Sequence, residues 1–213
     1  MCSHGNSGGH GGSCADSVAQ FDHGSEGMQY NLNNFIVKEK VVVLNEAVEG
    51  SGVKVFKSWE DKHDRTQFVE SDVDQELLFY IPFKGHVKVS GIAICGNLDD
   101  SHPANVRIFK DKDNMSFDEV STMKPIQEMQ LKQDDAAQID YPLIASKFAS
   151  VSSLTLYFNA NFGSDSTRIF YIGLRGEYER DFRDKVVIAT YEARPVPDDH
   201  KAELPDTAHH HVC

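Results

Sequence analysis

The sequence predicts an all-β domain, a β-sandwich or jelly roll of about eight or nine short strands. Short segments rich in β-branched and aromatic residues alternate with clusters of Gly, Asn, Asp, Ser and Pro, a pattern typical of strands joined by turns. No stretch of about 12 residues repeats its apolar positions at helical spacing. No repeat of fixed period is present either, which disfavours a propeller or a solenoid.

The strand with the highest apolar density is predicted at residues 77–83. Large apolar side chains occupy both parities of this stretch, so a strand here lies inside the core. Just upstream, Asp72 and Asp74 favour a turn because their short side chains bond back to the backbone. A shorter strand is predicted at Val41–Leu44, where β-branched residues are dense.

A second strand is expected directly after the strand at residues 77–83. Lys84 and Gly85 predict a tight turn, so residues 76–95 are expected to form an antiparallel hairpin. The bulky side chains change parity at Gly91, which predicts a β-bulge at that point.

The remaining elements follow in order along the chain. Turn formers at Gly96–Pro103 predict a surface loop, and Met115–Asp118 predicts a single helical turn. Further strands are predicted at residues 106–109, 126–131, 138–141, 151–158, 167–177 and 185–191.

Polar tails flank the predicted domain, which runs from residue 28 to 193. Residues 1–27 contain seven Gly, five Ser and three His, too few large apolar side chains to offset the entropy of ordering. Residues 194–213 are rich in Pro and charged residues and are predicted to form a flexible tail. The four cysteines contain no C-x-x-C pair, which disfavours a disulfide framework and a dithiol site, and Cys95 is expected to be a buried reduced thiol.

Composition limits the partners. The 21 Lys and Arg against 33 Asp and Glu give a formal net charge of −12, which disfavours nucleic acid and anionic membranes. No apolar run reaches the roughly 18 to 20 residues of a membrane span, and the N-terminus lacks the apolar core of a secretory signal. We therefore predict a soluble monomer in the cytoplasm, with the nucleus as a second expected compartment.

Five segments, in this order, resemble the PITH domain family. They are F-K-S-W-E at residues 56–60, F-V-E-S-D-V-D-Q-E-L-L-F-Y-I-P-F at 68–83, G-N-L-D-D-S-H-P at 96–103, M-S-F-D at 115–118 and F-Y-I-G-L-R-G-E at 170–177. The resemblance covers roughly residues 29 to 193 and is specific because all five occur together. It implies a jelly roll of the galactose-binding-like type, without known catalytic activity and associated with the 26S proteasome. The proteasome-interacting thioredoxin of this family carries a thioredoxin domain that this chain lacks, so no redox activity is carried over.

Candidate partner-binding residues lie in two acidic segments and, for Arg175, in the strand predicted at residues 167–177. Loops joining the strands of a sandwich are where such proteins bind partners. The candidates are Glu70, Asp72, Asp74, Asp99, Asp100, His102 and Arg175. A structural ion pair of Arg175 with Asp72 or Asp74 is preferred to an anion site there. Asp99, Asp100 and His102 could also ligate a metal ion, but a simple acidic turn is preferred.

Two further hypotheses concern small ligands. Trp59 and Tyr178 are exposed candidates for stacking on a sugar, although a tryptophan in such a position is more often a half-buried anchor. His209, His210 and His211 near the C-terminus could bind zinc, including the zinc of the deubiquitinase in the proteasome lid.

The sequence as a whole predicts a non-enzymatic protein-interaction module that binds and modulates the 26S proteasome, without a cofactor. His63, His86 and His102 stand without a Ser or Cys motif, so no catalytic constellation is recognised. The alternative is a β-sandwich module for a small ligand, either a sugar or a metal ion.

Overall fold

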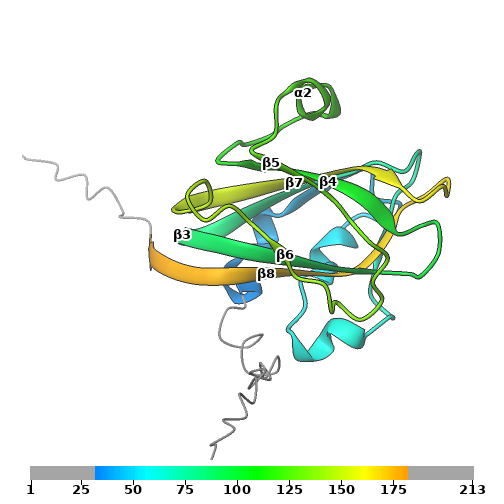
Figure 1. The fold of residues 1–213 in the computed structure, drawn as a ribbon, viewed down its shortest axis with the longest axis horizontal. Helices are drawn as coiled ribbons and strands as arrows, with labels where there is room; N and C mark the ends of the chain where they lie inside the picture. The colour runs from blue at the N-terminus through cyan, green and yellow to red at the C-terminus, as the bar shows by residue number, and fades with distance from the viewer. Residues whose placement is uncertain (1–31, 182–213) are drawn as a thin grey trace, which may run out of the picture. The chain divides into compact units, whose positions relative to one another are not determined.

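The computed structural model describes residues 32–181 (Figure 1). The strands are β1 (Val42–Leu44), β2 (Val69–Glu70), β3 (Leu77–Gly96), β4 (Pro103–Lys110), β5 (Gln127–Gln130), β6 (Tyr141–Pro142), β7 (Val151–Asn161) and β8 (Arg168–Asp181). The helices are η1 (Leu32–Phe35), η2 (Lys38–Lys40), η3 (Gly52–Val55), η4 (Glu60–His63) and α2 (Phe117–Thr122), of which the η segments are 3₁₀ turns. The predicted strand at residues 185–191, both predicted tails and His209–His211 lie outside the described residues.

Every strand pairing in the sheet is antiparallel, which confirms the predicted all-β fold. The strand order is β2-β8-β3-β7-β4-β5, and β1 and β6 pair additionally with β3. In Figure 1, β4, β5 and β7 lie on the upper side and β8 on the lower side, and β3 pairs with both β7 and β8. Apolar side chains from β3, β4, β7 and β8 pack together as the main core.

The predicted hairpin at residues 76–95 is wrong, because β3 continues as one strand of 20 residues. Gly85 makes no turn and instead lets the backbone of β8 approach closely. A Cβ at this position would lie 2.2 Å from the carbonyl oxygen of Arg180 in β8. The predicted bulge near Gly91 is confirmed by a register shift between Val89 and Gly91 in the pairing with β8. A single bent strand can therefore pair first with β7 and then with β8.

Within residues 32–181 the other expected elements occur, with changes in extent. The helical turn expected at Met115–Asp118 becomes α2, whose start is fixed by a capping box between Ser116 and Glu119. The strand expected at residues 138–141 is reduced to the two residues of β6. Cys95 is fully buried and reduced, as predicted. Among the helices within residues 32–181, none is long and apolar enough to span a membrane.

Candidate functional site: adjacent acidic loops

Four loops hydrogen-bond to one another at one end of the sheet. We define the loop surface as residues 45–50, 71–76, 97–102 and 162–167. Backbone bonds join the first loop to the second, the second to the fourth, and the fourth to the third: Asp72 N to Asn45 O (3.0 Å), Ser71 N to Thr167 O (3.0 Å) and Phe162 N to Asp100 O (3.1 Å). In Figure 1 the loop between β3 and β4 and the loop between β7 and β8 lie together at the right-hand edge. The two predicted acidic segments are thus brought into one region.

Asn45 organises the first pair of loops. Its backbone is left-handed, with φ of 67°, a conformation that Asn tolerates better than most residues. Its side-chain amide donates to the Asp74 carboxylate (2.8 Å) and the Glu76 carbonyl (2.7 Å), and its side-chain oxygen accepts from Val73 N (3.1 Å). The Asp74 carboxylate also accepts from Glu76 N, so the predicted acidic turn is present and Asp72 and Asp74 lie at its exposed tip.

Arg168 forms an ion pair with Glu70, which lies in β2 just before the acidic turn. Glu70 and Arg168 lie opposite each other on β2 and β8, and an Arg168 Nη2 to Glu70 Oε2 distance of 2.8 Å makes an ion pair. Ser166 donates a further hydrogen bond to Glu70 (2.9 Å). These contacts fix the base of the loop surface.

The predicted ion pair of Arg175 with Asp72 or Asp74 is wrong, because Arg175 pairs with Asp140. Its Nε lies 3.1 Å from Asp140 Oδ1, and its Nη2 contacts the other carboxylate oxygen. Arg175 lies opposite Gly91, where the missing side chain leaves room for this pair. The predicted structural role of Arg175 in an ion pair is confirmed, but the partner is Asp140, which the sequence pattern does not single out.

The loop before β4 is a turn closed by Asp99. Its Oδ1 accepts hydrogen bonds from the Ser101 hydroxyl and from Ser101 N (2.9 Å). The bond from the Ser101 hydroxyl contributes most to holding the pKa of Asp99 below its ordinary value. Asp99 and Asp100 are exposed, so both remain candidates for partner contact.

His102 is completely buried, unlike the neighbouring Asp99 and Asp100. Its Nε2 accepts from Asp134 N (3.1 Å), so the ring proton lies on Nδ1 and is donated to Pro103 O (2.8 Å). Both ring nitrogens are therefore engaged, and the ring is a structural element of the loop base instead of a surface ligand. Sequence reasoning missed Asp134, a buried carboxylate that accepts from Ala136 N and Ile139 N.

Burial makes His102 a source of acid sensitivity, because desolvation lowers its pKa below the ordinary value of 6.5. Below pH 6.5 the unfolded chain binds a proton that the folded chain excludes. The free energy of unfolding should therefore fall as pH decreases from 6.5 through the folded pKa. Denaturant unfolding across this range should show the slope in the wild type and a smaller slope in His102→Gln. The exposed His63→Gln variant is the control, and an equal slope in His102→Gln would contradict the assignment.

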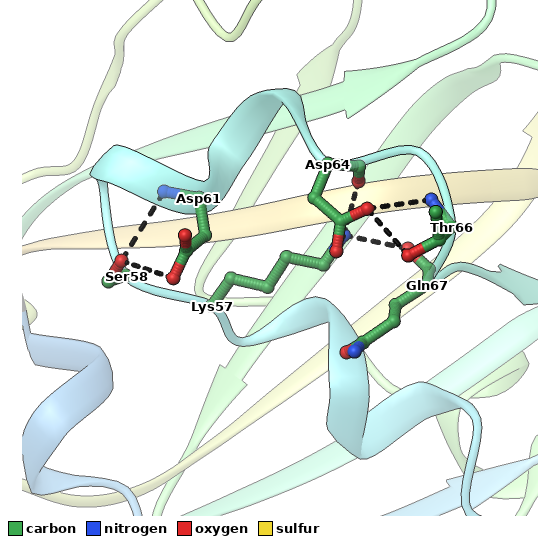
Figure 2. A network of polar contacts seen from close by, with 6 residues as sticks. All are labelled: Lys57, Ser58, Asp61, Asp64, Thr66 and Gln67. Carbon is green, nitrogen blue, oxygen red and sulfur yellow. Dashed lines mark hydrogen bonds and ion pairs between the residues drawn. The ribbon is translucent and has the colours of Figure 1, made fainter.

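A second polar network fixes the segment that contains Trp59 (Figure 2). The buried Lys57 ammonium donates to the carbonyl oxygens of Asp64 and Gln67 and lies 3.9 Å from the Asp64 carboxylate. The Asp64 carboxylate in turn accepts from Thr66 N (2.8 Å) and the Thr66 hydroxyl (2.6 Å). Residues 57–67 are thus held around one buried cation.

The proposed sugar platforms are occupied by other side chains. Trp59 is half-buried: it makes a T-shaped contact with Tyr171, and the Lys62 ammonium lies 3.6 Å from the centre of its ring. Tyr178 stacks on Phe35 at a centroid distance of 4.3 Å. The expected exposure of both rings is wrong, and the anchor interpretation of Trp59 is the one that the packing supports. Within residues 32–181, no group of three His, Cys, Asp or Glu residues is arranged to hold a metal ion.

Comparison with known proteins agrees with the sequence resemblance. The family model described as PITH domain matches residues 22–195. PITH domain-containing protein ZK353.9 of Caenorhabditis elegans is 50% identical over 206 residues, covering 97% of each chain. PITH domain-containing protein 1 of Homo sapiens is 44% identical over 199 residues, covering 93% of this chain and 94% of the human protein.

A solved structure shares the fold at low sequence identity. It contains the CBM32-1 and CBM32-2 domains of Clostridium perfringens ZmpB in complex with GalNAc, and aligns with a TM-score of 0.52 and 8% identity. The alignment covers 72% of this chain and 38% of that one. At this identity the likeness concerns the fold alone, and it confirms the predicted galactose-binding-like jelly roll.

Proposed function

Because the chain belongs to the PITH domain family, we propose that it is a non-enzymatic protein-interaction module whose partner is the 26S proteasome. The observation that carries this proposal is the family match over residues 22–195, which includes all five segments that resemble the family of the proteasome-interacting thioredoxin. The PITH domain family supports a protein-interaction module in general, whereas the fold alone does not decide between this role and small-ligand binding.

The loop geometry supports an interaction role. Asp74 and Asp99 accept hydrogen bonds from backbone groups of their own turns, and the Asn45 side chain bonds backbone groups of the neighbouring loop 71–76. The exposed side chains therefore lie on loops that hydrogen bonds already hold in place. A preordered surface loses less conformational entropy on binding than a flexible one. His102 bonds two backbone groups through its ring, which suits a structural role better than that of a general base.

Affinity capture with purified 26S proteasome tests the proposal. The tagged full chain, immobilised at near-physiological salt, should retain proteasome subunits, whereas an unrelated β-sandwich of similar negative charge should not. If the chain retained no proteasome subunits under these conditions, the proposal would be wrong.

The small-ligand alternative is tested on the same preparation. Thermal denaturation with galactose, GalNAc, Ca²⁺ or Zn²⁺ should leave the midpoint unchanged, because the Lys62 ammonium covers the Trp59 ring, Tyr178 is stacked on Phe35 and His102 is buried. A saturable increase with one of these ligands would favour the alternative.

A further inference from the structure

Each of the four loops exposes one large apolar side chain. The exposed fractions are 65% for Val48, 84% for Val73, 63% for Leu98 and 42% for Phe162. These four are half of the eight large apolar residues that residues 32–181 expose. Single exposed apolar residues are ordinary on protein surfaces, but four on adjacent loops are typical of an interaction surface.

Carboxylates accompany each apolar side chain. The four loops contain two, three, two and one acidic residues in chain order, and no Lys or Arg. The acidic side chains that are exposed are Glu49, Asp72, Asp74, Asp99, Asp100 and Asp165. Arg168, which borders the loop surface, is already paired with Glu70. The region thus combines exposed apolar side chains with an excess of negative charge.

The eight carboxylates of the loop surface fall into two groups: those that accept hydrogen bonds within the domain and those that close no turn within residues 32–181. Asp74 and Asp99 close their own turns through Oδ1. Glu46 accepts from Gly50 N and Gly52 N, and Glu76 accepts from the Tyr157 hydroxyl. The remaining four close no turn, and their charges are available to a partner: Glu49, Asp72, Asp100 and Asp165.

We propose that the loop surface binds a basic segment of a partner protein, in which Lys or Arg side chains are interspersed with apolar ones. Apolar residues of the segment cover the exposed loop tips, which removes apolar surface from water. Its cations lie beside the carboxylates, where complementary charge favours encounter and orientation. This inference deepens the proposed function and rests on it only in taking the partner to be a protein.

The negative charge of the loop surface favours a basic segment over an acidic segment or nucleic acid. An acidic segment would place like charges together, and nucleic acid would be repelled by the same carboxylates. A lone cation would not account for the four apolar tips. A basic, apolar segment satisfies both features of the surface.

A pair of synthetic peptides provides the probe: an Arg/Leu/Ser peptide and its counterpart with Glu in place of each Arg. Fluorescence anisotropy with the full chain should detect binding of the Arg peptide, weakening as salt rises, and little binding of the Glu peptide. Amide chemical shifts of the ¹⁵N-labelled chain should change in the loop surface. Binding of both peptides alike, shifts confined to other regions, or no binding of the Arg peptide would overturn the proposal.

Two variants test the two components separately. The charge variant combines Glu49→Gln, Asp72→Asn, Asp100→Asn and Asp165→Asn, and the apolar variant combines Val73→Ser and Leu98→Ser. Each should weaken binding of the Arg peptide about tenfold without loss of folding, because the altered side chains are exposed.

The matched controls lie away from the loop surface on exposed positions. The charge control removes the same number of carboxylates as the charge variant and combines Glu39→Gln, Asp118→Asn, Glu177→Gln and Glu179→Gln. The apolar control combines Met123→Ser and Ile144→Ser. Equal affinity of the two test variants and these controls would overturn the proposal.

Proteasome capture separates this inference from the proposed function. If the wild-type chain captures proteasome and both loop variants capture it equally, the loop surface is not the docking site and the inference fails alone. If the wild type binds the Arg peptide through the loops but captures no proteasome, the proposed partner fails and the surface assignment stands.

Discussion

Replacing Asn33 with Ala should destabilise the domain by about 3 to 4 kcal/mol, because three buried backbone groups lose their partners. The Asn33 amide donates to Lys57 O (2.9 Å) and Ile172 O (2.9 Å), and its oxygen accepts from Leu174 N (3.2 Å). One buried side chain thereby joins η1 to β8 and to the segment that Lys57 organises. Urea unfolding followed by circular dichroism measures the change.

The adjacent residue provides the control for Asn33. Asn34 is exposed, and Asn34→Ala should change the free energy of unfolding by less than about 0.5 kcal/mol. Asn33→Asp should be at least as damaging as Asn33→Ala, since a carboxylate cannot donate and would be a buried charge. A destabilisation of Asn33→Ala no larger than that of Asn34→Ala would show that the three bonds contribute little.

Replacing Lys57 with Met should cost about 2 to 3 kcal/mol, somewhat less than the Asn33 change. The variant keeps the apolar length of the side chain but leaves the carbonyl oxygens of Asp64 and Gln67 without their donor. Part of that loss is offset because the folded chain no longer desolvates a cation, and it is this desolvation that lowers the pKa of Lys57.

Local and global effects of Lys57→Met can be separated with Trp59, the only tryptophan in the chain. Its emission should shift toward that of an exposed indole before circular dichroism reports loss of the sheet, because residues 57–67 lose their central cation. The control is Lys54→Met on an exposed position of η3. Coincident transitions with unchanged stability would refute a structural role for the Lys57 network.

Sequence reasoning predicted the fold class and most strands because apolar periodicity is a local property. It failed at residues 84–85, where Lys84 and Gly85 have the composition of a turn but lie inside β3. The reason for Gly85 is the approach of the β8 backbone, which is a tertiary contact. The bulge at Gly91 was predictable because an extra residue in a strand changes the parity of the bulky side chains in the sequence.

The site shows the same division between local and tertiary information. The turns containing Asp74 and Asp99 were predictable because their hydrogen bonds join residues two positions apart. The burial of His102, the pairing of Arg175 with Asp140 and the role of Asn33 depend on segments distant in sequence. A polar residue that will be buried carries no local sign of its partner, so these contacts required the structure.

The placement of β3 and β8 has a consequence for biosynthesis. β3 ends at Gly96 and its long partner β8 begins at Arg168, which follows 72 residues later. At ribosomal speeds of about 5 to 20 residues per second, roughly 4 to 14 s pass between the end of β3 and the start of β8 synthesis. During this interval an apolar strand edge is uncovered on the nascent chain, which makes this half of β3 the expected point of chaperone engagement and of misassembly between nascent chains.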